Sequence, residues 1–306
     1  MTGKFWKPSA CECTPFVSRQ QGRRRLTGEQ KTSLMAPRRR FRRNALVVFF
    51  LCCFFFILMN NGRVTSYNQN CCIPALSSVL EYMEYIDNKQ AVCNNWVQLG
   101  GWNGAPEDGK KFLCLDERFR LDRNDCVVLS FGVNNEWSFE DDAESLGCKI
   151  YAFDPSMSVE EYHRSPKIKF FGIGISDFQG EMEVGQLKDV RAGKAKTLPV
   201  FRYEEIVRRL GLEGRVIDYV KMDIELAELD VLRDLLDNSP RLLRNINQIA
   251  FEVHHDLMEG RMRAGSNVQD FWTLFHRLEC AGFRILYSRT ASIWQEMVWS
   301  REIHAN

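Results

Sequence analysis

The chain alternates short apolar runs with helical stretches from Asp125 onward. Near-continuous apolar strands separated by helices are typical of a parallel sheet with helices on both faces. The last two runs have no helix between them, which predicts an antiparallel hairpin at one edge. We therefore expect an α/β domain over residues 125–306 with a seven-stranded mixed sheet. The seven runs are CVVLSF, KIYAF, IKFFGIGI, IDYVKMDI, INQIAFEV, FRILYS and SIWQEMVW.

The residues that follow the first predicted strand are candidates for a ligand site. Ligands of open α/β sheets lie beyond the carboxyl ends of the strands. Here the strand is followed by Gly132, Asn134 and Asn135. A glycine lets the backbone approach a ligand closely, and asparagines tolerate unusual dihedral angles while offering side-chain amides. A tight strand-to-helix turn explains the same residues, so both interpretations stay open at this loop.

Acidic residues end the second and third predicted strands. Asp154 follows Gly132 by about twenty residues, where a carboxylate accepts hydrogen bonds from the hydroxyls of a nucleoside ribose. An Asp-Pro turn is the alternative for Asp154. Asp177 ends the third strand and is a candidate for a contact with adenine, with a plain hairpin turn as the alternative.

Charged residues also mark the fourth and fifth predicted strands. Lys221, Asp223 and Glu225 alternate along an extended strand and project to one side of it. Buried charges persist only when they are paired, so we expect these side chains to meet near the ligand crevice. His254 ends the fifth strand and is a candidate general base, because an unperturbed histidine has a pKa of about 6.5. A packing or surface histidine is the alternative, and no cysteine or histidine spacing predicts a metal site.

Residues 1–43 differ in composition from the rest of the chain. They carry a net charge of +10, which leaves −9 for the remainder. Their Pro, Ser, Thr, Gln and Arg follow no helical or strand period, and such a segment buries too little apolar surface to offset its ordering entropy. We expect a disordered cytosolic tail. Because its arginines adjoin an apolar run, they predict a membrane flank, and no nucleic-acid binding is expected.

The apolar run ALVVFFLCCFFFILM at 45–59 has no charged residue. It is shorter than the roughly 20 residues of a typical transmembrane helix and at the upper end for a signal-peptide core. The arginines before it place the N-terminus in the cytosol by the positive-inside rule. We expect a signal-anchor at 44–60 and a single-pass type II membrane protein of the Golgi or endoplasmic reticulum lumen, with secretion after signal cleavage as the alternative. Residues 61–124 then form a lumenal linker and helical extension.

Seven of the eleven cysteines lie beyond this run. An oxidising lumen favours disulfides. If the strands that begin at Val127 and Lys149 are parallel neighbours, Cys126 and Cys148 lie side by side at their starts. A disulfide and a pair of reduced core cysteines are equal alternatives for these two residues.

Residues 125–299 resemble the FkbM-like branch of the S-adenosylmethionine-dependent methyltransferases. The resemblance rests on VVLSFGVNN, IYAFDPS, GISDFQGEMEV, and YVKMDIELAELDVL followed by IAFEVHH. LSFGVNNEWSFE and YAFDPSM resemble the probable methyltransferase-like protein 24 group, and this resemblance reaches back to KFLCLDERF before the domain. The resemblance implies a class I methyltransferase (Rossmann-like) fold and S-adenosylmethionine as the cofactor. It implies cofactor contacts from Gly132, Asn134, Asn135, Asp154 and Asp177, and a place for Asp223 and Glu225 beside the transferred methyl group or the acceptor.

The function that the resemblance implies is O-methylation of an acceptor in the secretory pathway. The acceptor is unidentified, and a glycan, a lipid or a protein side chain are all compatible with a lumenal enzyme. A neutral hydroxyl must lose its proton, which gives Asp223, Glu225 or His254 a catalytic role.

Three positions depart from the family pattern and support a second hypothesis. Ser130 stands in place of an aspartate, and Glu136 and Leu226 stand in place of glycines. These changes favour a catalytically impaired methyltransferase fold that acts as a lumenal binding module. A Golgi glycosyltransferase is a third hypothesis, but its candidate metal-binding acids, Asp141 and Asp142, fall inside a predicted helix.

Overall fold

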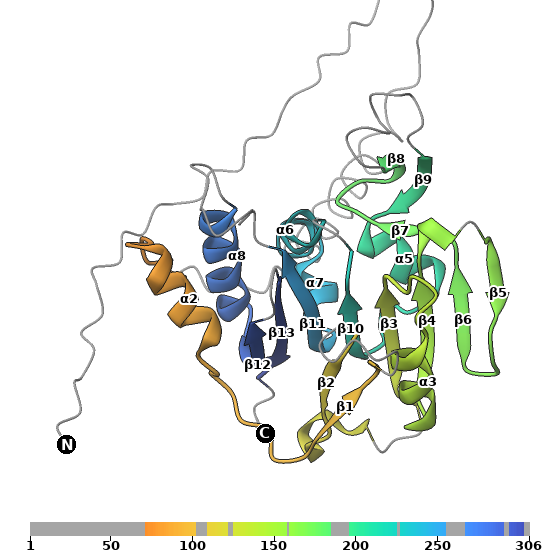
Figure 1. Ribbon diagram of the computed structural model, residues 1–306, viewed down its shortest axis with the longest axis horizontal. Helices are drawn as coiled ribbons and strands as arrows, with labels where there is room; N and C mark the ends of the chain where they lie inside the picture. The colour runs from red at the N-terminus through yellow and green to blue at the C-terminus, as the bar shows by residue number, and fades with distance from the viewer. Residues whose placement is uncertain are drawn as a thin grey trace, which may run out of the picture. The chain divides into compact units, whose positions relative to one another are not determined.

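The main sheet contains eight strands among the described residues, and its five central strands run parallel (Figure 1). The structure is a computed structural model that describes residues 71–101, 109–121, 125–157, 159–184, 196–224, 227–254, 267–290 and 294–302. The strand order is β12-β13-β11-β10-β3-β4-β6-β5. These strands are β3 (Val127–Phe131), β4 (Lys149–Phe153), β5 (Glu161–His163), β6 (Ile168–Phe171), β10 (Ile217–Met222), β11 (Ile246–His254), β12 (Phe283–Thr290) and β13 (Trp294–Arg301).

The predicted mixed α/β sheet is confirmed, with one strand more than the seven expected. The final two runs form the predicted hairpin, in which β13 is antiparallel to both β11 and β12. The additional strand is β5, which pairs antiparallel with β6 at the other edge. Its three residues, EYH, are too few and too polar to give a strand pattern.

The third predicted run does not form one strand. It divides into β6 and β7 (Gly174–Ile175), and β7 belongs to a separate small sheet of order β7-β9-β8. The break falls at Gly172, where a Cβ atom would lie 1.9 Å from the Val159 carbonyl oxygen. This close approach of two backbones ends the strand. The other members are β8 (Gly180–Val184) and β9 (Lys196–Phe201), which are antiparallel to each other.

Alternate residues of the central strands enter two apolar cores, one on each face of the sheet. Leu129 packs in the core that contains residues of α2 (Val79–Asp87), α5 (Tyr203–Arg209), α6 (Glu228–Asn238), α7 (Pro240–Leu243) and α8 (Val268–Cys280). Val128 packs in the other core, with residues of α3 (Ser138–Ser145) and of the hairpin β1 (Trp96–Leu99) and β2 (Lys111–Cys114). Helices therefore lie on both faces, as predicted.

The segment before the sheet contains more structure than its sequence indicates. The expected helical extension contains α2, where the Ser78 hydroxyl accepts a hydrogen bond from the Glu81 backbone amide. The extension was expected to be a linker with helix, yet it also contains β2, which pairs antiparallel with β1. Residues from Ile73 onward form one unit, so this hairpin belongs with the sheet.

The expected tail at 1–43 and signal-anchor at 44–60 lie outside the described residues. Within the described part of the chain, none of the helices has the length and the hydropathy needed to cross a bilayer.

Candidate functional site at the carboxyl ends of the strands

The loop after β3 brings the ends of three strands together at Gly132. The Gly132 backbone amide donates to the Phe153 carbonyl oxygen on β4 over 2.9 Å, and the Asp223 amide after β10 donates to the Phe131 carbonyl oxygen over 3.0 Å. Gly132 has a φ of 84°, and a Cβ atom there would lie only 1.8 Å from the Asp223 carbonyl oxygen. Only glycine fits this junction without moving the backbone.

Asn134 and Asn135 continue the loop in left-handed conformations. Their φ angles are 47° and 59°, which asparagine tolerates better than most residues. Both residues are exposed, so their side-chain amides are open to a ligand beyond the strand ends. The structure thus has the turn and the accessible amides that the sequence predicted here.

The Asp154 side chain holds this loop against the end of β4 through hydrogen bonds. One carboxylate oxygen accepts hydrogen bonds from the Val133 and Asn134 amides over 2.9 and 2.7 Å. The other accepts from the Ser156 amide and hydroxyl over 2.8 and 2.5 Å. Burial by itself would raise the pKa of Asp154, but the hydrogen bonds from Ser156, Asn134 and Val133 together lower it. The carboxylate therefore supports the loop, and its contact with a ribose stays a prediction.

Asp177 lies in the turn between β7 and β8 of the small sheet. Its carboxylate accepts a hydrogen bond from the Ser176 hydroxyl over 3.2 Å, and it is exposed. The preceding Gly174 packs close to the Pro155 ring that follows Asp154. Asp177 is thus on a surface beside the second strand end, and its contact with adenine stays a prediction.

The predicted catalytic residues end β10 and β11. Asp223 is half-buried directly after β10. His254 is the last residue of β11, where its backbone pairs with Trp294. Glu225 lies outside the described residues. The neighbouring Glu228 begins α6 and is buried.

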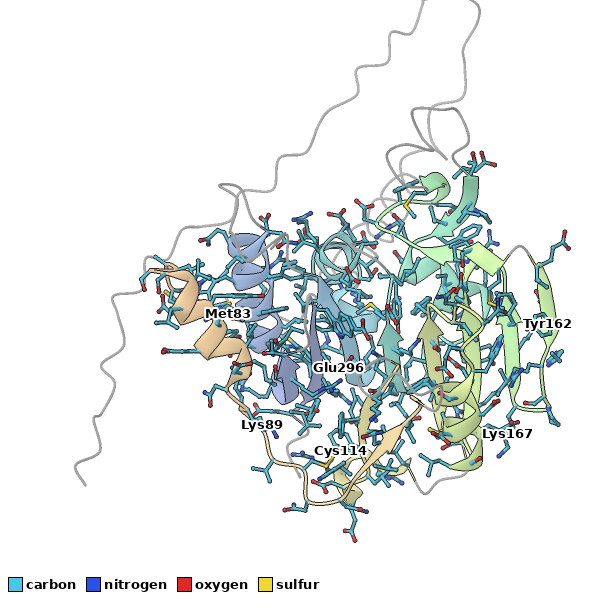
Figure 2. All side chains as sticks on the ribbon, viewed as in Figure 1. Met83, Lys89, Cys114, Tyr162, Lys167 and Glu296 are labelled. Atoms are coloured by element: carbon cyan, nitrogen blue, oxygen red, sulfur yellow. A yellow bond between two sulfur atoms is a disulfide. The ribbon has the colours of Figure 1, made fainter. Side chains whose placement is uncertain are left out.

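A buried ionic cluster beside Asp223 was not predictable from the motifs at the strand ends. Lys111 of β2 donates to Glu252 of β11 over 2.5 Å and to Glu296 of β13 over 2.6 Å. Their exposed fractions are 0%, 4% and 1%, respectively, and Glu296 lies well inside the domain (Figure 2). One signal was available, since an acid within the apolar run SIWQEMVW requires a buried partner.

The strand register explains why this cluster needs a cation. Glu252 and Glu296 are directly paired across β11 and β13. Two carboxylates in such positions repel each other. Burial raises the pKa of Glu296 to about 8. The nearby charges of Glu252 and Asp223 also raise this pKa, whereas the charge of Lys111 lowers it. Although burial opposes it, Glu296 and Glu252 raise the pKa of Lys111, which therefore stays charged.

We expect Glu296 to make stability depend on pH. The folded protein holds this proton with a pKa of about 8, compared with an ordinary value of 4.5. This stabilisation is therefore complete below pH 4.5 and is lost as the pH rises to about 8. Urea unfolding of the wild type should show a larger loss of stability between these pH values than unfolding of Glu296→Gln. Equal losses in the two proteins would contradict the assignment.

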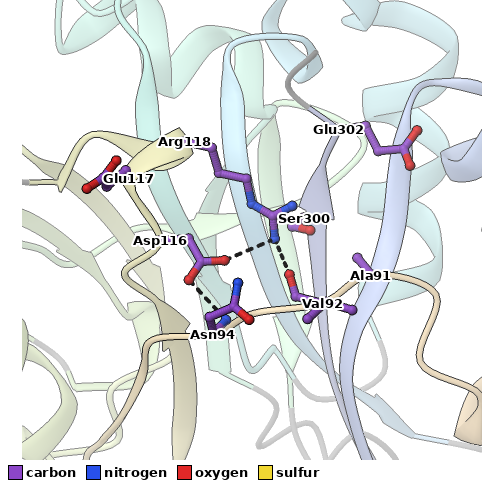
Figure 3. A pocket seen from close by; sticks show the side chains of 8 residues that line it. All are labelled: Ala91, Val92, Asn94, Asp116, Glu117, Arg118, Ser300 and Glu302. Atoms are coloured by element: carbon purple, nitrogen blue, oxygen red, sulfur yellow. Dashed lines mark hydrogen bonds and ion pairs between the residues drawn. The ribbon is translucent and has the colours of Figure 1, made fainter. Parts of the chain in front are cut away.

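A cavity of about 650 Å³ lies away from the strand ends (Figure 3). It is lined partly by Ser300, which pairs with Gln248 near the start of β11. The polar groups in it contact one another: Arg118 donates to the Val92 carbonyl and lies 3.7 Å from Asp116. This cavity is therefore at the opposite end of β11 from the candidate site.

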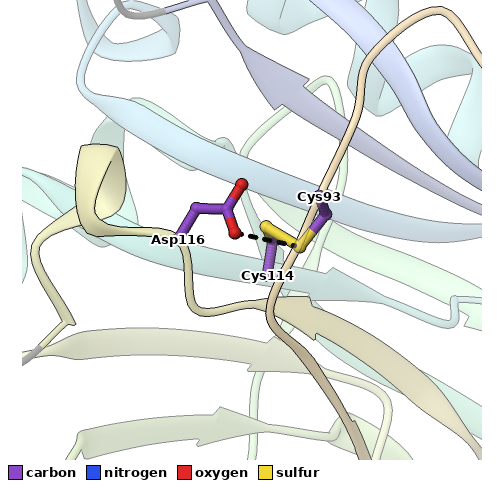
Figure 4. A group of neighbouring side chains, drawn as sticks. All are labelled: Cys93, Cys114 and Asp116. Atoms are coloured by element: carbon purple, nitrogen blue, oxygen red, sulfur yellow. Dashed lines mark hydrogen bonds between the residues drawn. A yellow bond between two sulfur atoms is a disulfide. The ribbon is translucent and has the colours of Figure 1, made fainter.

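A group of potential metal ligands near that cavity does not supply thiolates. The ligand atoms of Cys93, Cys114 and Asp116 lie within 4.8 Å of one another, but the two sulfur atoms form a disulfide (Figure 4). A disulfide sulfur is not the thiolate that binds a metal ion. A second disulfide joins Cys126 and Cys148 at the starts of β3 and β4, which confirms the pairing that strand adjacency suggested.

Five parallel strands are followed in the sheet by β13, which is antiparallel and lies between β11 and β12. This strand order defines a class I methyltransferase-like α/β fold. Its glycine junction and acids lie at the carboxyl ends of the strands, where ligands of open α/β sheets bind. Residues 63–297 match the family model described as a methyltransferase domain, and the chain belongs to this family.

Solved structures similar to this chain have low identity to it. One is the 16S rRNA (adenine(1408)-N(1))-methyltransferase from Catenulisporales acidiphilia, with 10% identity over 64% of this chain and 96% of that chain, and a TM-score of 0.32. The fibrillarin/Nop5p complex has 12% identity over 59% and 74%, with a TM-score of 0.34. TrmK from M. capricolum with S-adenosyl-homocysteine has 11% identity over 61% and 71%, with a TM-score of 0.27. No curated protein matches the chain.

Proposed function

We propose that this chain is an S-adenosylmethionine-dependent O-methyltransferase of the FkbM-like branch that acts in the secretory pathway. The observation that carries the proposal is the junction at Gly132. There, backbone hydrogen bonds and one close contact join the ends of β3, β4 and β10, beside exposed amides and a half-buried acid. Such a junction can bind a nucleoside-containing ligand and face it with a carboxylate.

The residues of this site fit the cofactor. Gly132, Asn134 and Asn135 would hold it through the backbone and the exposed side-chain amides, with Asp154 and Asp177 on the side of the ribose and the adenine. The bound sulfonium supplies an already activated methyl group. The protein then aligns the acceptor and excludes water. Asp223, with Glu225 and His254, would accept the proton of the acceptor hydroxyl.

The proposed compartment is the secretory lumen. Two disulfides, Cys93–Cys114 and Cys126–Cys148, support it, because disulfides persist in oxidising compartments. The apolar run at 45–59 supports a type II anchor, with signal cleavage as the alternative. A glycan, a lipid or a protein hydroxyl would be the acceptor in such a compartment.

Calorimetry of the full-length chain with S-adenosylmethionine tests the proposal. We expect the wild type to bind and Asp154→Ala to bind at least about 10-fold more weakly, because the Val133 and Asn134 amides lose their shared acceptor. Asp230→Ala is the matched control, since Asp230 is exposed and, among the residues that the structure describes, forms its ion pair with Arg233 on the same helix. Absence of binding by the wild type at millimolar cofactor would contradict the enzyme assignment.

One observation favours a lumenal binding module as the second candidate. The Asp154 carboxylate already accepts four hydrogen bonds from the protein, which is about the capacity of a carboxylate. A ribose would have to displace some of these contacts. Under this alternative the fold persists while the same titration shows no heat of cofactor binding.

A further inference from the structure

Glu140 lies beneath the loop after β3 with one oxygen that has no hydrogen-bond partner. The side chain comes from the first turn of α3 and has an exposed fraction of 0%. Its Oε1 accepts a hydrogen bond from the Ser130 hydroxyl over 2.5 Å, whereas no described group bonds to its Oε2. Burying an ionised carboxyl group that lacks a hydrogen-bond partner destabilises the fold unless a nearby cation balances its charge.

Lys221 is the cation next to this carboxyl group. It is the direct register partner of Ser130 on the adjacent parallel strand β10, and only 5% of it is exposed. Its ammonium group donates to the Gly132 carbonyl oxygen and lies 5.8 Å from the centre of the Phe139 ring. Burial raises the pKa of Glu140, and the charge of Lys221 opposes that shift, so the two groups interact electrostatically.

Among the groups near Lys221, Glu140 is the one that can serve as its counter-charge. None of the ion pairs among the described residues includes Lys221, and Asp223 after the same strand makes no such pair either. Ser130 is neutral at the position where a short acid would lie directly across from Lys221. The negative charge that could lie on β3 is therefore supplied by Glu140, a buried residue of α3.

We propose that Glu140 is a positioning residue for the cofactor loop, which balances Lys221 and so keeps the lysine bonded to the Gly132 carbonyl. Without this charge, the buried ammonium group would turn toward water or toward Asp223. Gly132 would then lose its bond from Lys221, and the loop through Asn134 would open more often. The effect on the cofactor rests on the proposed function, whereas the effect on the loop does not.

A charge-relocation experiment in the full-length protein tests this role. Glu140→Gln keeps the size of the side chain but removes its charge, and Ser130→Asp with Glu140→Gln moves the charge directly opposite Lys221. We expect hydrogen exchange at the Val133 and Asn134 amides to quicken about 10-fold in Glu140→Gln and to return to within about 3-fold of the wild type in the double variant. Ser130→Asp alone should also quicken exchange, because it places two acids side by side.

Ser130→Ala distinguishes the charge from the hydrogen bond. It removes only the hydroxyl that bonds Glu140, so we expect less than about 3-fold faster exchange at the same amides. Equal exchange in Glu140→Gln and the wild type, no recovery in the double variant, or an effect of Ser130→Ala as large as that of Glu140→Gln would each overturn the proposal. Because exchange is measured without ligand, failure of the wild type to bind S-adenosylmethionine in calorimetry would contradict the proposed function alone.

Discussion

Lys111→Met is expected to lower the free energy of unfolding by about 3–5 kcal/mol, because it leaves two buried acids without the cation that contacts both. Glu252 and Glu296 are register partners on β11 and β13, and Lys111 contacts both. Urea unfolding under non-reducing conditions measures the loss. The loss should shrink as the pH falls, since protonation of Glu296, whose pKa burial raises to about 8, removes one of the uncompensated charges.

Two control proteins separate the ionic cluster from other effects of this change. Lys110→Met alters the adjacent, only half-buried lysine and should change stability by no more than about 0.5 kcal/mol. Lys111→Met combined with Glu252→Leu and Glu296→Leu replaces the whole cluster with apolar groups and should recover most of the loss. A stable Lys111→Met protein, or one as unstable at low pH as at neutral pH, would contradict the role of Lys111.

Gly132→Ala is expected to lower the free energy of unfolding by about 2–5 kcal/mol and to abolish measurable cofactor binding. The new Cβ atom would lie 1.8 Å from the Asp223 carbonyl oxygen, and the φ of 84° is unfavourable for alanine. The ends of β3 and β10 would have to separate. Urea unfolding and calorimetry with S-adenosylmethionine measure the two effects.

Gly211→Ala is the matched control for this change. Gly211 also has a positive φ, of 66°, but nothing lies within 4 Å of its added Cβ atom. We expect a loss of about 1–2 kcal/mol from the backbone conformation alone, with cofactor binding unchanged. If the two variants were equally stable and bound cofactor equally well, the close contact at Gly132 would have no functional importance.

Lys111 gives the N-terminal extension a structural role at the site. The hairpin of β1 and β2 covers one face of the sheet, and the side chain of Gln248 bonds both backbone groups of Cys114. Lys111 then reaches the carboxyl ends of the strands, next to Asp223. A methyltransferase domain that began at Asp125 would lack the cation on which Glu252 and Glu296 depend.

Much of the fold was predictable because its signals are local. Each apolar run and each amphipathic helix carries its own period, and the acids at the strand ends follow their strands directly in sequence. The split of the third run at Gly172 and the edge strand β5 were not predictable. The first depends on a contact with Val159 from another segment, and the second is too short to show a period.

The sequence alone determined the α/β class, the succession of strands and the positions of Gly132, Asp154 and Asp223 at strand ends, because these follow from short-range periodicity. Only the tertiary structure decided which charges meet. Lys111 contacts acids that lie 141 and 185 residues away, and Glu140 reaches Ser130 from a different element. Such pairings depend on which strands become neighbours and on their register, and local sequence patterns carry no record of either.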